Sequence, residues 1–489
     1  MPPGQGTENA FGIVDYTVLV VYFALLIGMG VYFSRREKDT ETFFLGGRKI
    51  PWWAVGLSIF GTSLSAITYI SIPATAFAGD WVSMPNNFGI LVLAPIIVAW
   101  YIPRLRKAPI VTAYEFLENR FNLATRIYGS IVFGAFQLMR MSIVLYLPSL
   151  ALSAATGLDI RACIVVMGIL ATVYTVLGGI EAVIWTDVIQ SFVLVAGAIL
   201  ALVIVVLNVD GGVSTVIATA HEADKFHTFN WSWDMMTASV WVVVVGGIFG
   251  GAYPAIADQT VVQRYLSTAS AKDAGKAVWT NALLTIPIQF LFYSLGTALW
   301  VFYHFHPDQW DSSLKNDVVL PLFVVQEFPA GLRGILIAGL FAASMSSLDS
   351  SMNSLSSVFI NDYYRRFKKN VEEQRALFMA RALTLAFGLF GTLSALFLTT
   401  VDVSTLFLTF LSFLGLIGGG LAGIFVLGVF TRKANGVGAI AGGIIGSTIV
   451  VTVKYTTEVH FMLYGMIGLL VAVIVGYFVS LVANESQSS

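Results

Sequence analysis

Long apolar runs recur along almost the whole chain, and each is long enough to cross a lipid bilayer as a helix. About thirteen runs of roughly 20 residues can be counted between residues 11 and 483. Because 57% of the 489 residues are hydrophobic, only 11% are charged and the mean hydropathy is +0.81, this composition fits no soluble globular class. The sequence therefore predicts an all-α polytopic membrane protein.

The lysines and arginines are distributed unequally between the connections that separate these runs. With the N-terminus outside, 21 of the 27 fall in segments expected in the cytoplasm, including 34–50, 104–126, 258–277 and 361–381, and five fall outside. The positive-inside rule therefore predicts an external N-terminus and an internal C-terminus. The first ten residues lack the basic region of a cleaved signal peptide. We expect a multi-pass monomer in the lipid bilayer of the plasma membrane (in bacteria, the inner membrane), without a nucleic-acid partner.

One apolar run contains a polar stripe, AASMSSLDSSMNSLSS, which extends from Ala342 to Ser357. At 100° per residue, one helix face carries Ala343, Ser346, Ser347, Ser350, Ser354 and Ser357, with Asp349 and Asn353 beside it. A buried hydroxyl or carboxylate without a partner costs about 2–7 kcal/mol, so this row needs something to coordinate. Its oxygens suit a hard cation better than zinc, copper or iron. Serines that bond only to their own helix are the alternative interpretation.

Arg140 lies about sixteen residues into the apolar run that begins near Ala124. A guanidinium at this depth costs about 2.5–3.5 kcal/mol even on an insertion scale, so it requires a water-filled cavity or an anion. The surrounding helix sequence, QLMRMSIVLYLP, contains no acidic side chain, which favours an anionic group on a transported solute. The alternative is a structural role, in which Arg140 pairs with helix carbonyls or with Asp349.

Two apolar runs carry small residues that indicate an interrupted helix. Gly61, Thr62 and Ser63 lie at the centre of 52–78, and the run 237–257 contains Gly246, Gly247, Gly250, Gly251 and Pro254. Because five runs separate the two positions, they predict two inverted repeats, 52–207 and 237–430, with broken helices around a midplane site. A leading helix, 11–33, and two C-terminal helices, 437–483, complete a single transmembrane domain, 1–489. A glycine-rich run taken alone more often marks a tight helix crossing.

Four separated motifs resemble the sodium:solute symporter family. They are YTVLGGIEAVIWTDVIQ at 174–190, DQTVVQRYLS at 258–267, the serine stripe, and TRKANGVGAIAGGIIGS at 431–447. The resemblance extends from about Asp15 to the last apolar run. It implies a LeuT-like fold, in which a leading helix precedes two inverted five-helix repeats, and it implies Na⁺ as the coupling ion.

The same resemblance implies sodium ligands. The main site would use the backbone carbonyls of Gly61, Leu64 and Ala343 and the hydroxyls of Ser346 and Ser347. Some members have a second site, which here would use Asp187, Ser346, Ser347 and Ser350. Asp349 stands where other members tend to have serine or threonine, so it either joins the second site or pairs elsewhere. A buried helix-terminal hydrogen bond is the alternative for Asp187.

The expected substrate pocket is more similar to that of the bacterial sialic acid transporters than to that of the sugar transporters. The resemblance assigns to it Ser63, Ser65, Thr68, Asn87 and Arg140. A planar guanidinium can engage a carboxylate through two parallel hydrogen bonds. Ser83 and Asn87 differ from the aromatic residue and the glutamine expected there, which leaves the identity of the sugar acid open. Thr68 and Asn87 also replace the Gln and Glu of galactose transporters, which argues against a neutral hexose.

These features predict a sodium-coupled symporter, not an enzyme, that imports a small carboxylate-bearing solute by alternating access. A sialic acid (N-acetylneuraminate) is the expected substrate, and another sugar, a small monocarboxylate or a vitamin-like anion is the alternative. A membrane sensor would need a signalling domain, which the tail ANESQSS is too short to form. A channel would need a continuous polar pore, and an enzyme would need a cluster of His, Cys or Glu within the apolar runs.

Overall fold

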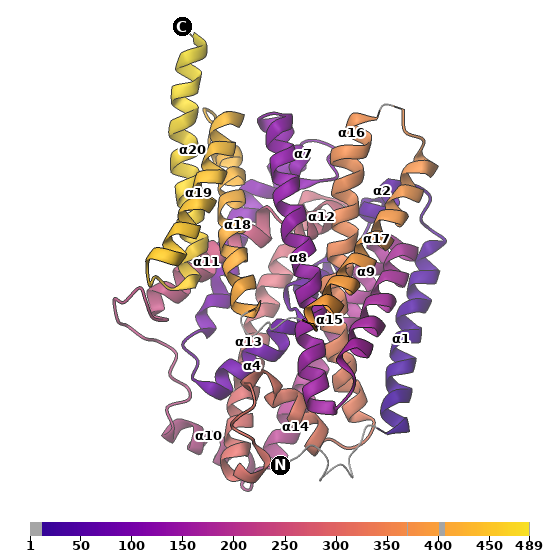
Figure 1. The fold of residues 1–489 in the computed structure, drawn as a ribbon, viewed down its shortest axis with the longest axis vertical. Coiled ribbons are helices and arrows are strands. Elements are labelled where there is room, and N and C mark those ends of the chain that lie inside the picture. Colours follow the sequence, from indigo (N-terminus) through magenta and orange to yellow (C-terminus); the bar gives the residue numbers. More distant parts are fainter. Residues whose placement is uncertain (1–11, 369, 401–405, 489) are drawn as a thin grey trace.

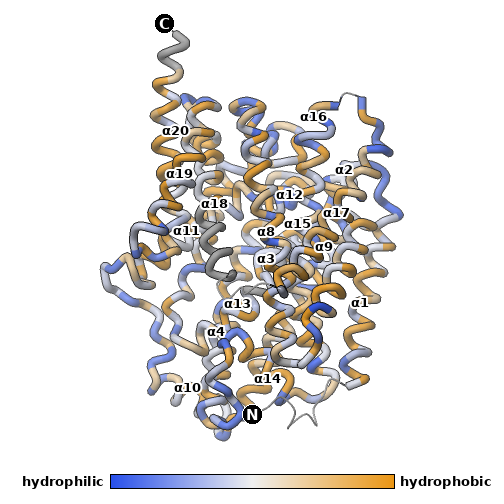
Figure 2. The backbone as a smooth tube through the Cα atoms, in the orientation of Figure 1, coloured by the Kyte–Doolittle hydropathy of each residue, from blue (hydrophilic) through white to orange (hydrophobic). Residues whose placement is uncertain are grey.

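The computed structural model describes residues 12–368, 370–400 and 406–488, and the regular secondary structure of this part is helical, with one isolated bridge between Ile50 and Thr268 (Figure 1). Nine of the described helices are long and apolar enough to cross a membrane, and each of two bent helix pairs forms a further candidate span. Figure 2 shows hydrophobic residues along the long helices and hydrophilic residues gathered in the connections at both ends. The predicted all-α membrane class is confirmed.

The first part of the chain contains the predicted leading helix, the first broken span and two longer helices, α8 (Leu123–Thr156) and α9 (Ile160–Leu207). In order these elements are α1 (Ile13–Ser34), α2 (Thr40–Leu45), η1 (Gly46–Arg48), α3 (Trp52–Ser63), α4 (Ala66–Ala78), η2 (Met84–Phe88), α5 (Gly89–Ile96), η3 (Ile97–Tyr101), α6 (Ile102–Leu105), α7 (Ala113–Arg120), α8 (Leu123–Thr156), α9 (Ile160–Leu207) and α10 (Gly212–Glu222). The two predicted spans 160–178 and 184–207 both lie in α9, which consists of two helices that meet at Gly179, where φ is 52° and ψ is −150° and the backbone is not helical. A Cβ there would lie 2.5 Å from the carbonyl oxygen of Phe43, so glycine permits both the kink and the contact.

The second part contains the second broken span, the serine-rich helix and the C-terminal helices. In order these elements are α11 (Val240–Ile256), α12 (Gln259–Ser267), α13 (Ala271–Phe305), η4 (Pro307–Gln309), η5 (Asn316–Val318), α14 (Val319–Glu327), α15 (Leu332–Val358), η6 (Phe359–Tyr364), α16 (Arg365–Phe367), α17 (Glu373–Leu398), α18 (Leu406–Phe430), α19 (Gly436–Thr456), η7 (Phe461–Leu463) and α20 (Tyr464–Ser488). Figure 1 shows α1 at one edge of the molecule and α19 and α20 at the opposite edge.

The first predicted break is present. Helices α3 and α4 meet at an angle of 56°. Leu64 leaves the helical region, with φ −86° and ψ 71°, and the Ser65 hydroxyl caps α4 by accepting from the Thr68 amide. The backbone groups freed at such a break can serve a ligand.

The second break lies further along the chain than the glycines predict. Helix α11 is continuous through Gly246 and Gly247, and the chain bends by 59° between α11 and α12, after Ile256. The glycines instead allow close helix crossings, since a Cβ on Gly247 would lie 2.0 Å from the carbonyl oxygen of Asn86. Gly246 and Gly247 therefore mark close helix crossings, whereas the predicted broken span is present with its bend just beyond Pro254.

Two arginines that the sequence assigns to connections lie inside the protein. Arg264, predicted in the cytoplasmic segment 258–277, is fully buried on α12, because that segment contains the second half of the broken span. Arg333, predicted outside, is only 5% exposed at the start of α15. A charge count along a sequence cannot distinguish a buried, paired arginine from one in a connection.

Helix α15 is the centre of the molecule. In its most apolar stretch of 18 residues, 94% is buried inside the protein, whereas the corresponding stretch of α1 is 28% buried. Its N-terminus is capped by α1, because the Asp15 carboxylate accepts from the amides of Gly331 (2.7 Å) and Gly334 (3.1 Å). The serine stripe therefore faces protein on all sides, and every polar group on it requires a partner within the protein or a bound ligand.

Candidate functional site

The serine stripe of α15 meets the first broken span at Gly61, in the last turn of α3. The Ser346 hydroxyl donates to the carbonyl of Gly61 at 3.3 Å and lies 3.2 Å from the carbonyl of Ala343, one turn earlier on its own helix. Three of the predicted main-site sodium ligands are therefore adjacent. Leu64 lies three residues beyond Gly61, at the break itself.

Ser347 is the unsatisfied member of this group. Its hydroxyl is fully buried and has no hydrogen-bond partner among the described residues. An orphaned buried hydroxyl costs about 1–3 kcal/mol. A dehydrated cation held by the hydroxyls and carbonyls would satisfy it, and the donor set of neutral oxygens suits a hard monovalent ion rather than a transition metal.

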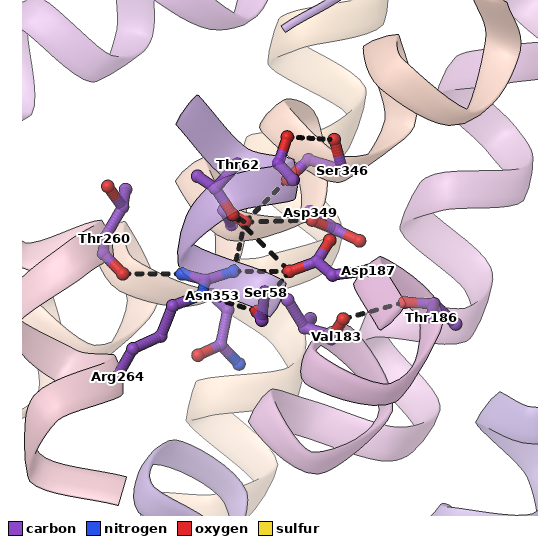
Figure 3. A network of polar contacts seen from close by, with 12 residues as sticks. Ser58, Thr62, Val183, Thr186, Asp187, Thr260, Arg264, Ser346, Asp349 and Asn353 are labelled. Carbon is purple, nitrogen blue, oxygen red and sulfur yellow. Dashed lines mark hydrogen bonds and ion pairs between the residues drawn. The ribbon is translucent and has the colours of Figure 1, made fainter. Parts of the chain in front are cut away.

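A second polar cluster lies one turn further along α15 (Figure 3). Asp187 of α9 forms a fully buried ion pair with Arg264 of α12, whose Nη2 lies 2.8 Å from Asp187 Oδ2. The same oxygen accepts from Ser58 and Thr62 of α3, whereas Oδ1 has no partner within the described part of the chain. Ser350 lies 2.7 Å from Arg264 and 3.2 Å from Thr62. This cluster therefore joins α3, α9, α12 and α15.

Asp349 lies beside the second cluster, on α15 itself. Its Oδ2 accepts from the Tyr174 hydroxyl at 2.6 Å and its Oδ1 accepts from the Ser350 hydroxyl at 3.1 Å. The side chain is completely buried. Arg264 donates to both Asp187 and Ser350, whereas Asp349 accepts hydrogen bonds from the neutral hydroxyls of Tyr174 and Ser350.

Arg140 of α8 lies between the two breaks. Its Nη2 donates to the carbonyl of Thr62, just before the first break, at 3.2 Å. Its Nη1 lies 3.9 Å from Oδ2 of Asp258, the N-cap residue of α12 at the second break. The acidic neighbour is therefore Asp258 and not Asp349, and the bond to the Thr62 carbonyl agrees with the alternative in which Arg140 pairs with helix carbonyls.

The remaining predicted substrate residues lie at or near the first break. Ser63 is exposed although it ends a helix in the middle of the fold, and Ser65 and Thr68 are half-buried and bond to each other at 3.1 Å. Asn87 of η2 donates to Gln289 of α13 at 3.1 Å. Ser63, Ser65 and Thr68 thus lie together along the first break, whereas the hydrogen bond of the Asn87 side chain is to α13.

Sequence reasoning missed several members of these clusters, among them Ser58, Thr62, Gln137, Tyr174, Asp258 and Arg264. Asp258 and Arg264 lie in the motif DQTVVQRYLS, all of whose α12 residues are buried. The amphipathic pattern of this stretch is typical of a packed helix, but its charged residues favoured the interpretation as a cytoplasmic connection. The other four have partners far along the chain, which no local pattern reveals.

Comparisons with known proteins agree with this architecture. A family described as the sodium:solute symporter family matches residues 43–446. The chain is 39% identical to the sodium/sialic acid symporter SiaT of Proteus mirabilis, over 95% of this chain and 94% of that protein. It is 38% identical to the sodium/sialic acid symporter NanT of Aliivibrio fischeri, over 98% and 95%. A solved structure described as the substrate-bound outward-open state of a Na⁺-coupled sialic acid symporter superposes with a TM-score of 0.92, at 38% identity, covering 96% and 98%.

Proposed function

Because the chain belongs to the sodium:solute symporter family, we propose that it imports a sialic acid across the plasma membrane, in bacteria the inner membrane, together with sodium. The observation that carries this proposal is the meeting of Ser346 with the Gly61 carbonyl beside the orphaned Ser347 hydroxyl, with Arg140 between the two breaks. The choice of a sialic acid as the substrate rests on the relatives SiaT and NanT, which are described as sodium/sialic acid symporters.

The main sodium site is formed by Gly61, Leu64, Ala343, Ser346 and Ser347. Carbonyls at a helix break are free to coordinate, and the unpartnered Ser347 hydroxyl supports a missing ligand at this position. Bound sodium would hold α3 against α15. The ion would therefore stabilise the arrangement in which the substrate pocket is complete.

A second sodium site uses Asp187, Ser346, Ser347 and Ser350, and Asp349 joins it through Ser350. The unpartnered Oδ1 of Asp187 and the Asp349 carboxylate beside Ser350 support it. Each sodium moved through 100 mV contributes about 2.3 kcal/mol. With one sodium per monoanion the cycle is electroneutral, whereas a second sodium adds the membrane potential to the driving force.

The substrate lies between the breaks, in contact with Ser63, Ser65, Thr68 and Asn87, and its carboxylate binds Arg140. The guanidinium forms one hydrogen bond with the described residues, which leaves further N–H donors for a carboxylate. The hydroxyls of Ser63 and Thr68 suit the polar substituents of a sugar acid.

Transport proceeds by alternating access in a monomer with about thirteen spans, an external N-terminus and an internal C-terminus. Two inverted repeats, 52–207 and 237–430, each begin with a broken helix, α3–α4 and α11–α12. They form one domain with the leading helix and the two C-terminal helices. Rocking of one group of helices against the other would open the site first to the outside and then to the cytoplasm.

Alanine variants of the two serines test the main site. Ser347→Ala removes an unsatisfied hydroxyl, so it should raise the melting temperature without sodium while abolishing the sodium-induced increase. Ser346→Ala should weaken sodium activation of N-acetylneuraminate uptake by proteoliposomes at least tenfold, about the worth of one charge-assisted contact. The matched control is Ser344→Ala on the same helix, because the Ser344 hydroxyl donates to Val144 instead. Unchanged sodium dependence in both variants would refute the site.

Competition distinguishes the proposed substrate from another carboxylate. Unlabelled sialic acid, lactate, biotin, proline and galactose are compared as inhibitors of sodium-driven uptake. Inhibition by lactate or biotin alone would assign the protein to a monocarboxylate or vitamin-like substrate instead.

A further inference from the structure

Asp258 is the acidic residue nearest to Arg140, but it is not a hydrogen-bond partner of that arginine. The 3.9 Å between Arg140 Nη1 and Asp258 Oδ2 allows an ion pair and exceeds the length of a hydrogen bond. Arg140 is 13% exposed and the Asp258 side chain 4% exposed, so water screens the pair weakly. The two charges therefore balance each other inside the protein.

Other groups satisfy the Asp258 carboxylate. Gln137 Nε2 donates to both carboxylate oxygens, at 3.1 and 3.2 Å. The amide and hydroxyl of Thr260 donate to Oδ1 at 2.8 and 2.7 Å, so Asp258 also caps α12. Asp258 consequently neutralises the charge of Arg140 without using any of its N–H donors.

A polar atom near this pair also lacks a partner. Tyr253, one turn before the second break, packs against Phe136 of α8 at a ring distance of 5.4 Å. Its buried hydroxyl has no hydrogen-bond partner within the described ranges. Gln137, in turn, accepts from Ser351 of α15 at 2.8 Å. Asp258 is therefore connected through Gln137 to the helix that carries the serine stripe.

We propose that Asp258 is a positioning residue that acts as the resident counterion of Arg140 when the substrate site is empty. The inference rests on the proposed function, in which Arg140 binds the substrate carboxylate. An arriving carboxylate takes the free donors of Arg140 and at the same time repels Asp258 across the guanidinium. Because Asp258 caps α12, this repulsion acts on the second broken span, and it also weakens binding enough for the anion to be released.

The variant Asp258→Asn tests this role, since asparagine keeps the size and the helix cap but removes the charge. The dissociation constant of N-acetylneuraminate should fall about tenfold, because one nearby negative charge is removed. The maximal uptake rate should fall as well, since release becomes slower. Binding of the uncharged methyl ester should not tighten. A purely structural role predicts weaker binding of both ligands. The matched control, Thr260→Val, loses one hydrogen bond to Asp258 Oδ1 but keeps the charge of Asp258. It should leave the dissociation constants of the acid and of its methyl ester near their original values.

Unchanged or weaker binding of the acid by Asp258→Asn, while Arg140→Ala abolishes its uptake, would overturn this inference alone. Normal uptake by Arg140→Ala would instead overturn the proposed substrate site. If Asp258→Asn accumulates poorly, the double variant Arg140→Gln, Asp258→Asn should restore the amount of folded protein, because neither charge remains. Failure of that rescue would also contradict the counterion role.

Discussion

Replacing Gly247 by alanine introduces a methyl group where α11 and η2 cross at backbone distance. The added Cβ would lie 2.0 Å from the carbonyl oxygen of Asn86 and 2.8 Å from its carbon. Since attractive contacts between heavy atoms begin at about 3.5 Å, the two backbones must separate by roughly 1.5 Å. Overpacking of this kind typically costs about 1–3 kcal/mol. Neither backbone can avoid the contact by rotating a side chain.

The displacement reaches the candidate substrate site. Asn87 follows Asn86 in η2, and its Nδ2 donates to Gln289 at 3.1 Å. A shift of more than 1 Å takes this pair beyond hydrogen-bond distance. We therefore expect Gly247→Ala to lower the melting temperature and to raise the KM for uptake.

The same helix offers a matched control. A Cβ on Gly250 would have no heavy atom within 4 Å, so Gly250→Ala should be neutral or stabilise α11 by up to about 1 kcal/mol. Thermal unfolding and uptake kinetics of both variants would be measured under the same conditions. If Gly247→Ala were as stable and active as Gly250→Ala, the crossing would not be rigid and the reasoning would fail.

Three other perturbations have defined outcomes. Burial raises the pKa of Glu37, in the connection between α1 and α2, from 4.5 to about 8, so folding favours the protonated form. The free energy of unfolding should therefore fall by at most about 5 kcal/mol as pH rises from about 4.5 to 8. Melting curves recorded across that range should lose this pH dependence in Glu37→Gln. Arg264→Met should lower stability by about 3–5 kcal/mol by leaving Asp187 buried and unpaired, and the added change Asp187→Leu should recover most of that loss in denaturation experiments, whereas no recovery would argue against the pair. Asp187→Asn should lower the charge moved per substrate, and an unaltered ratio of current to uptake would eliminate the second sodium site.

The sequence predicts the features that depend on composition and local periodicity. The apolar runs indicate the membrane class, and the periodicity of the serine stripe predicts that Ser346 and Ala343 share a face, where the Ser346 hydroxyl lies beside the carbonyls of Ala343 and Gly61. The break at Leu64 is also predictable, because small polar residues interrupt an apolar run there.

The features that were missed depend on contacts between distant segments. A glycine such as Gly247 is compatible with either a helix break or a close helix crossing, and only the position of Asn86 in the fold distinguishes the two. Arg264 resembles a residue of a connection until its partner Asp187, 77 positions away, is known. Likewise, no pattern within α8 indicates that the acidic neighbour of Arg140 is Asp258.

The cap that Asp15 provides for α15 affects how the protein is made. The bond from the Gly331 amide to this carboxylate joins residues 316 positions apart. Asp15 lies on α1, which is synthesised first, so it can form this bond only after α14 has been synthesised. Until then, Asp15 must keep water or another temporary partner at the membrane surface, because an unpaired carboxylate is expensive to bury. A shortened chain that lacks α1 would therefore insert with the N-terminus of α15 uncapped, so α1 should be required for the stability of the buried serine-rich helix as well as for attachment to the membrane.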